Sequence, residues 1–227
     1  KDTTVNGKKV DIREGEKLID LIAREGIVVP SLCFHPDLEV RASCRICMVE
    51  ADGALVPACS TEATEGMGIR TETEEIRRTR KTNLELIFAQ HCEECADCAW
   101  FMNCKLLDLA KEYGADIKRF EDRKEGRPTI KMGPVEFDTS KCIDCRNCIE
   151  VCESQGVSLL KTRDRGHLRE VLPVGEPAED CVHCGQCILH CPAGAFEAID
   201  EFEGTKRPLA EEGKVVVFQI APAARVS

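Results

Sequence analysis

Aromatic side chains are scarce in this sequence, which limits how its fold can be held together. Only 4% of the 227 residues are aromatic, with one tryptophan, Trp100, and one tyrosine, Tyr113. Because each aromatic side chain buries a large apolar surface, we do not expect large apolar cores to carry the fold alone. The chain has 16 cysteines instead. Small domains with so many cysteines are commonly stabilised by disulfides or by metals.

Long apolar runs and basic clusters are also missing. No run approaches the roughly 20 apolar residues that span a bilayer, and no basic start with an apolar segment marks a secretory leader. The formal net charge is -10 and Lys and Arg form no stripe, which argues against binding to nucleic acid. We therefore expect a soluble cytoplasmic protein. In that compartment, closely spaced cysteines are metal or cluster ligands rather than disulfides.

The cysteines fall into four groups of four along the chain. The last two groups share the spacing C-x2-C-x2-C-x3-C, which is the bacterial 4Fe-4S ferredoxin run, and the fourth cysteine of each run ligates the other cluster. A single zinc ion usually takes one C-x2-C pair from each of two separate loops, so it competes poorly here. The spacing predicts two 4Fe-4S clusters with these ligands: Cys142, Cys145, Cys148 and Cys191 for one, and Cys181, Cys184, Cys187 and Cys152 for the other.

The first group is Cys33, Cys44, Cys47 and Cys59. One C-x2-C pair with two outlying cysteines also suits a tetrahedral zinc site, and the spacing alone leaves that alternative open. Residues 4–12 alternate around an Asn-Gly pair, which predicts a hairpin, and residues 16–24 carry an apolar helical face. A hairpin, a helix and then a cysteine loop are typical of the beginning of a β-grasp ferredoxin. This context favours a 2Fe-2S cluster.

The second group lies in the stretch QHCEECADCAWFMNC. It has five candidate ligands: His91, Cys92, Cys95, Cys98 and Cys104. Amphipathic patterns predict one helix before it, over residues 73–90, and another after it, over residues 106–114. A cluster with four ligands leaves one candidate over. The residues themselves allow either His91 with three cysteines or all four cysteines.

The segment SLCFHPDLEVRASCRICMVEADGALVPACST, the pattern His91-x3-Cys95-x2-Cys98-x5-Cys104 and the two ferredoxin runs together resemble a known family. It is the N-terminal iron-sulfur region of electron-bifurcating, NAD(P)-linked FeFe-hydrogenase alpha subunits, which is related to the complex I large iron-sulfur subunit and to NAD-linked formate dehydrogenases. The resemblance covers essentially the whole chain. It implies a 2Fe-2S cluster at the first group and a 4Fe-4S cluster held by His91, Cys95, Cys98 and Cys104. Cys92 is then the spare residue.

We expect an α+β fold with three domains. Residues 1–78 are predicted to form a β-grasp 2Fe-2S ferredoxin-like domain, and residues 79–119 a small helical domain with a 4Fe-4S cluster held by one histidine and three cysteines. Residues 138–213 are predicted to form a bacterial-type ferredoxin domain with two 4Fe-4S clusters. Charged residues mixed with Gly and Pro predict a solvated linker over residues 120–137. Residues 214–227 are expected to form a strand and a tail.

One 2Fe-2S and three 4Fe-4S clusters on one chain favour an electron relay, because the protein can set the potential of each cluster. The sequence has no G-x-G-x-x-G motif after a strand and no P-loop. We therefore expect FMN and NAD(H) on a partner, and no substrate turnover within these 227 residues. The resemblance implies four partners: a flavin/NAD(H)-binding subunit, a small 2Fe-2S subunit, a catalytic hydrogenase or dehydrogenase subunit, and ferredoxin.

Two alternatives to a relay subunit stay open. The residues VVVFQIAPAARVS resemble the start of the hydrogen-activating domain of FeFe-hydrogenases, so the chain can also be the relay portion of a longer polypeptide of that kind or of a formate dehydrogenase. A structural zinc protein without a redox role is the other alternative. Iron and acid-labile sulfide analysis separates it from both redox hypotheses.

Overall fold

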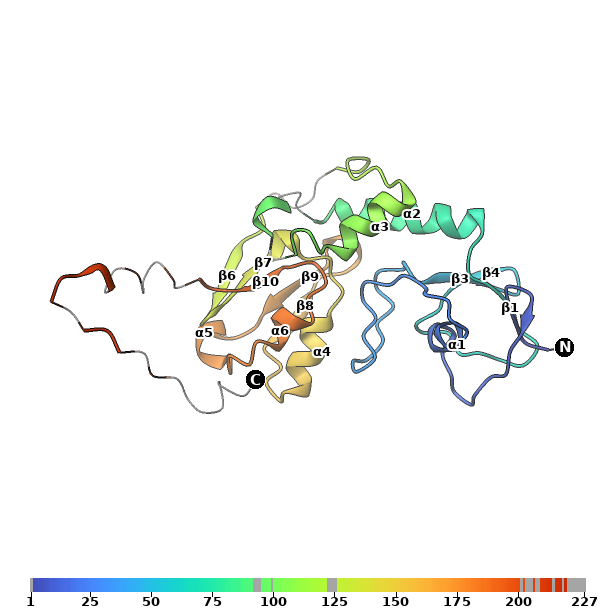
Figure 1. Ribbon diagram of the computed structural model, residues 1–227, viewed down its shortest axis with the longest axis horizontal. Coiled ribbons are helices and arrows are strands. Elements are labelled where there is room, and N and C mark those ends of the chain that lie inside the picture. Colours follow the sequence, from blue (N-terminus) through green and yellow to red (C-terminus); the bar gives the residue numbers. More distant parts are fainter. Residues whose placement is uncertain are drawn as a thin grey trace.

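Three regions follow one another along the chain, each with its own cysteine-rich loops (Figure 1). The computed structural model describes residues 2–91, 95–98, 100–121, 126–200, 202, 206, 209–213, 215–217 and 219. We call residues 2–71 the N-terminal region, residues 72–121 the helical region and residues 126–200 the ferredoxin-type region. Helices and strands are mixed throughout, so the predicted α+β class is confirmed. In the part of the chain so described, no helix is long and apolar enough to cross a membrane.

The N-terminal region is a five-stranded sheet with one helix packed on it. The strand order is β2-β1-β5-β3-β4, with β1 parallel to β5 and the other pairs antiparallel. The elements are β1 (Thr4–Val5), β2 (Lys8–Lys9), α1 (Leu18–Arg24), β3 (Met48–Ala51), β4 (Ala54–Pro57) and β5 (Gly68–Arg70).

Local sequence explains both the hairpin and the helix of this region. Asn6 and Gly7 have φ angles of 50° and 83°, the positive values that a two-residue hairpin turn requires. Helix α1 places Leu18, Leu21 and Ile22 fully inside the core, and each such side chain contributes about 1.5–3 kcal/mol through burial. The predicted β-grasp order of hairpin, helix and cysteine loop is therefore present.

The helical region consists of α2 (Glu74–Phe88), the 3-10 turn η1 (Cys95–Asp97) and α3 (Lys105–Tyr113). Thr73 caps α2 by accepting a hydrogen bond from the backbone N–H of Ile76 at 3.2 Å. Gly114 ends α3 in the left-handed conformation, for which glycine has no steric cost. The two helices pack on each other, and α2 also contacts β3. The two helices therefore connect the N-terminal region to the loop between α2 and α3, which carries the second cysteine group (Figure 1).

The ferredoxin-type region has a three-stranded sheet, a hairpin and short helices around its two cysteine runs. The sheet order is β10-β7-β6, and β8 pairs with β9. Phe137 and Phe196 stack across this sheet with ring centroids 4.1 Å apart. The elements are β6 (Thr129–Met132), β7 (Val135–Asp138), η2 (Thr139–Lys141), α4 (Asn147–Ser154), β8 (Leu160–Arg163), η3 (Gly166–Leu168), β9 (Glu170–Pro173), α5 (Pro177–Asp180), α6 (Gln186–Leu189) and β10 (Phe196–Ala198).

One sequence expectation is wrong. The segment expected to be a solvated linker contains β6 and most of β7, which form a hairpin paired to β10. The turn residues Gly133 and Pro134 connect these strands, and Met132, Val135 and Phe137 are buried. The many charged residues in this segment made its short alternation of more and less buried positions, which is typical of a strand, hard to recognise in the sequence. Of the expected C-terminal strand, the described residues 215–217 and 219 are not in a strand, and its other residues lie outside the described part.

Besides the core under the N-terminal sheet, one apolar cluster connects all three regions. Leu32, Cys33 and Cys44 of the N-terminal region belong to the same buried cluster as Leu84 of α2 and Cys145 of the ferredoxin-type region. On the surface, Arg41 Nε lies 2.6 Å from Glu150 Oε1 on α4. The loops that carry the four cysteine groups are therefore packed against one another.

Candidate metal centres

The first site, defined as Cys33, Cys44, Cys47 and Cys59, is fully enclosed. All four thiols are buried, and the backbone N–H of Cys44 donates to Cys33 Sγ at 3.5 Å. Cys33 donates to Cys44, which lowers the pKa of Cys44 to about 6 and raises the pKa of Cys33 well above its usual range. Cys59 donates to Cys47 in the same way, so the pKa of Cys47 is lowered and that of Cys59 is raised. One thiol of each pair therefore keeps its proton here, and all four would have to lose their protons to bind a metal. It is the enclosure of four thiols together that suits a cluster.

A buried hydroxyl beside the first site also fits a cluster. Ser43 Oγ has no hydrogen-bond partner among the residues that the structure describes, and Ser43 directly precedes Cys44. Buried polar groups normally have a partner. The sulfur atoms of a bound 2Fe-2S cluster would supply acceptors there.

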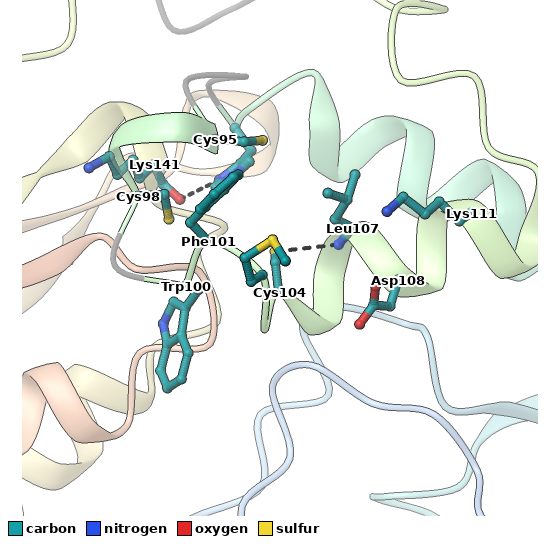
Figure 2. Close-up of a pocket in the computed structure, with 11 residues that line it drawn as sticks. Cys95, Cys98, Trp100, Phe101, Cys104, Leu107, Asp108, Lys111 and Lys141 are labelled. Atoms are coloured by element: carbon teal, nitrogen blue, oxygen red, sulfur yellow. Dashed lines mark hydrogen bonds between the residues drawn. The ribbon is translucent and has the colours of Figure 1, made fainter.

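The second site, defined as His91, Cys95, Cys98 and Cys104, surrounds a cavity of about 280 Å³. Figure 2 shows the three cysteines around this cavity together with Trp100, Phe101 and Lys141. Helix α2 delivers His91 just after its last turn, and Cys104 caps α3 by accepting from the N–H of Leu107 at 3.4 Å. One imidazole and three thiols around a single cavity fit a four-ligand cluster.

The tautomer of His91 supports its role as a ligand. His91 is 5% exposed, and its Nδ1 lies 2.7 Å from the backbone carbonyl oxygen of Lys141. A carbonyl oxygen only accepts hydrogen bonds, so Nδ1 carries the proton, and in the neutral ring Nε2 has the lone pair that can bind iron. Cys92, the competing residue, lies outside the described residues.

The third site, defined as Cys142, Cys145, Cys148 and Cys191, brings together the crossed ligand set expected from the ferredoxin runs. Burial raises the pKa of Cys142 to about 12 and holds the pKa values of Cys145 and Cys148 well above their usual range. Cys191 is close enough to add to the shift at all three thiols. Cys191 Sγ in turn accepts a hydrogen bond from the N–H of Ala195 at 3.2 Å.

The fourth site, defined as Cys152, Cys181, Cys184 and Cys187, is the other crossed set, and these four cysteines line one cavity. Burial raises the pKa of Cys187 to about 12, with Cys181 and Cys184 adding to the shift. Cys184 is exposed. The fourth site therefore lies nearer the surface than the third.

The third site is next to each of the other three. Cys44 of the first site belongs to the same buried cluster as Cys145, and α4, which carries Cys148, contacts α6, which carries Cys187 of the fourth site. Trp100, which lines the second-site cavity, donates its Nε1–H to the Cys191 carbonyl at 3.0 Å. Gly194, three residues after Cys191, also lies close to the second site, since an added Cβ there would lie 2.9 Å from Cys98 Sγ.

The described part of the chain has no group of three or more His, Cys, Asp or Glu side chains gathered tightly enough for a metal ion. The ligands of a multi-iron cluster surround a larger body than those of a single ion and stand further apart. The four predicted groups are each brought together in space, but the ligand sets themselves stay predictions.

Sequence reasoning missed two residues at these sites. Lys141 and Trp100 both line the second-site cavity. The Lys141 carbonyl accepts a hydrogen bond from the second-site residue His91, and Trp100 donates one to the carbonyl of the third-site residue Cys191. Lys141 directly precedes Cys142, and Trp100 is the only tryptophan and lies inside the ligand stretch. Their positions next to or among predicted ligands were the features of the sequence that pointed to these two residues. Nothing in the sequence placed residue 141 beside His91, because 50 residues separate them.

Family models match all three regions. Residues 2–74 match a 2Fe-2S iron-sulfur cluster binding domain, residues 80–119 match the NADH-ubiquinone oxidoreductase-G iron-sulfur binding region, and residues 141–195 match a 4Fe-4S dicluster domain. These matches give the chain domains of the 2Fe-2S type and of the 4Fe-4S type. They leave the number of clusters and the predicted domain boundaries as predictions.

Curated relatives are much longer than this chain. The NADP-reducing hydrogenase subunit HndD of Solidesulfovibrio fructosivorans is 32% identical over 99% of this chain, which spans 40% of that protein. The NADH-ubiquinone oxidoreductase 75 kDa subunit of Reclinomonas americana is 31% identical over 85% of the chain, which spans 28% of it. The NADPH-Fe(3+) oxidoreductase subunit alpha of Geobacter sulfurreducens is 31% identical over 97% of the chain, which spans 26% of it.

A solved structure has the same fold. An NAD+-reducing [NiFe]-hydrogenase in the H2-reduced state matches with a TM-score of 0.80 and 26% identity, over 87% of this chain and 86% of that one. The predicted family is therefore confirmed. The chain belongs to the family of iron-sulfur regions that is shared by NADP-reducing hydrogenases and by the 75 kDa subunit of NADH-ubiquinone oxidoreductase.

Proposed function

We propose that this chain is the electron-relay part of a multi-subunit NAD(P)(H)-linked oxidoreductase, with one 2Fe-2S cluster at the first site and 4Fe-4S clusters at the other three. The observation that carries the proposal is the position of the third site, which adjoins each of the other sites. When bound, iron-sulfur clusters supply one-electron redox centres whose potentials depend on charge, hydrogen bonds and exposure. This chain's residues hold the clusters, exclude water from the inner ones and keep the sites close together.

His91 is proposed as the fourth ligand of the second site, with Cys92 as the spare cysteine. The support is the hydrogen bond from His91 Nδ1–H to the Lys141 carbonyl, because such a partner fixes the ring and leaves Nε2 for the metal. A neutral imidazole in place of a thiolate makes this cluster less negative than an all-cysteine one. Its potential should then differ from those of the third and fourth sites.

The proposed partners follow from the relatives. Relatives named for NADP reduction, NADPH oxidation and NADH oxidation support a flavin/NAD(H)-binding subunit that carries FMN, a small 2Fe-2S subunit and a catalytic hydrogenase or dehydrogenase subunit. A central site with three neighbours suits a branched path better than a linear one. This branching is why we further propose ferredoxin as a partner and the electron-bifurcating hydrogenase type as the class of complex.

The first experiment is metal analysis and EPR of the anaerobically purified protein. We expect about 14 iron atoms per chain, about two from a 2Fe-2S cluster and about twelve from three 4Fe-4S clusters, with matching acid-labile sulfide. Dithionite should produce four reducible spin systems. A colourless protein that contains zinc without sulfide would contradict the proposal.

The second experiment separates the two ligand sets of the second site by comparing His91→Ala with Cys92→Ala. We expect His91→Ala to remove or convert one 4Fe-4S signal and Cys92→Ala to leave all signals in place. The opposite pattern would show that Cys92 is the ligand and that His91 is a neighbouring residue.

A further inference from the structure

Lys141 lies at the boundary between the second and third sites. It ends the 3-10 turn η2 and directly precedes Cys142 of the third site. Its backbone carbonyl accepts the hydrogen bond from His91 Nδ1–H at 2.7 Å. Lys141 is among the residues that line the second-site cavity, and its side chain is only 10% exposed. Lys141 therefore bonds a second-site ligand through its backbone and belongs to the same cavity lining as Cys98 (Figure 2).

The ammonium group of Lys141 is held in place by two carboxylates. Its Nζ lies 2.9 Å from Glu197 Oε1 on β10 and 3.7 Å from Asp138 Oδ2. Burial works to lower the pKa of Lys141, but the hydrogen bond to Glu197 and the charges of Glu197 and Asp138 outweigh it and leave that pKa raised. These two ion pairs hold a cation at the edge of the second-site cavity.

We propose that Lys141 sets the reduction potential of the cluster at the second site by placing a partly buried positive charge at the edge of the second-site cavity while its carbonyl orients His91. The inference rests on the proposed function, since it needs a cluster in this cavity. Reduction adds one electron to the cluster and makes it more negative. A nearby cation stabilises the reduced form, and it does so more strongly where solvent screens it little.

Lys141 could instead serve only to hold η2 against β10 through its ion pair with Glu197. The two roles predict different results from substitutions that change charge. A purely structural role makes Lys141→Met and Glu197→Gln equivalent, because each breaks the same ion pair. A charge effect gives these two substitutions opposite signs, because one removes a positive charge and the other a negative charge.

The test is an EPR-monitored redox titration of the second-site signal in the whole chain, with the fourth-site signal as the internal reference. We expect Lys141→Met to lower the reduced-to-oxidised ratio at a fixed potential about tenfold, which equals about 59 mV for a one-electron couple. Glu197→Gln should raise the ratio, and the double variant should return it towards that of the unsubstituted protein. Lys141→Arg should stay close to the unsubstituted protein, because it keeps the charge.

Lys111→Met is the matched control, because Lys111 also lines the cavity but is exposed. Its charge is screened by solvent, so we expect a smaller shift than with Lys141→Met. Equal shifts in the two lysine variants, or shifts of the same sign in Lys141→Met and Glu197→Gln, would overturn the inference while leaving the proposed relay intact. If Lys141→Met loses the cluster, Glu197→Gln alone tests the inference: a raised reduced-to-oxidised ratio supports it, and an unchanged or lowered ratio overturns it. Absence of a second-site cluster from the unsubstituted protein would overturn both proposals.

Discussion

The third and fourth sites have the same cysteine spacing but very different surroundings. In the third site Cys145, Cys148 and Cys191 are 7%, 5% and 7% exposed, whereas Cys184 of the fourth site is exposed. Val182 and Leu189, which lie within the second run, are also exposed. The same ligand motif therefore serves an interior site and a surface site. The two sites differ in how many residues from the other regions of the chain pack around them.

The cover of the third site comes from both other regions. Cys44 approaches it from the N-terminal region, and Cys98 and Trp100 approach it from the helical region. No such neighbours from those regions line the fourth-site cavity among the described residues. Because exposure is one of the terms that set a cluster's potential, the two ferredoxin-type clusters should differ in potential, accessibility and structural importance.

The largest expected effect comes from removing one ligand of each site. We expect Cys145→Ala to destabilise the cluster-loaded protein by about 4 kcal/mol or more, since loss of a metal centre is among the most damaging single changes. Cys184→Ala should cost clearly less, because fewer regions pack around its site. Thermal unfolding with iron analysis checks this order. Equal losses of stability would show that burial does not distinguish the sites.

A second prediction concerns the contact between the third and second sites. Gly194 has a φ of 65°, and an added Cβ would lie 2.9 Å from both Cys98 Sγ and Trp100 Cδ1. Gly194→Ala should therefore cost more than the roughly 1–2 kcal/mol of a left-handed alanine, and it should perturb the second-site EPR signal. Gly185→Ala is the matched control, with a φ of 70° and no atom within 4 Å of its Cβ. Gly185→Ala should lose only the stability that a left-handed alanine costs, and it should leave the second-site EPR signal unchanged.

A third prediction concerns chemical access. The exposed Cys184 should make the fourth-site cluster the first of the ferredoxin-type pair to degrade under limited ferricyanide or oxygen, several-fold faster than the third-site cluster. The decay of each EPR signal during timed oxidation measures this order. Faster decay of the third-site signal would mean that a path to solvent reaches the interior site.

The smallest expected effect comes from the ion pair that ties the first-site loop to α4. Arg41 bonds Glu150, whose side chain is 9% exposed, so Arg41→Met should cost about 1 kcal/mol or less. Arg163, which pairs with Glu170 across the exposed β8–β9 hairpin, provides the control in Arg163→Met. We expect a smaller loss of stability there. A loss as large as that from Arg41→Met would argue against any role for the interdomain pair.

The ligand groups could be predicted from the sequence because each depends on short spacings, and the ligand sets themselves stay predictions. The duplicated runs and the crossing of Cys152 and Cys191 came from spacing alone, and the structure brings each crossed group together. The hairpin at Asn6-Gly7 and the capped helices α2 and α3 also follow from local residue preferences.

What the sequence could not predict depends on long-range packing. The strand β6 was hidden by charged residues and is stabilised by pairing with β7, which in turn pairs with β10 about 60 residues away. The two runs gave no sign of which would be buried, since that depends on the approach of Cys44 and Trp100. Lys141 looked like an ordinary charged residue until the fold placed it beside His91.

The central claim is that the third site adjoins the other three, and EPR of the fully reduced protein tests it most directly. Clusters that lie close together broaden one another's signals and speed their relaxation. In Cys145→Ala, which lacks the third-site cluster, we predict that the first-, second- and fourth-site signals all become sharper and relax more slowly. In Cys184→Ala only the third-site signal should change. Unchanged first- and second-site signals in Cys145→Ala would contradict the account.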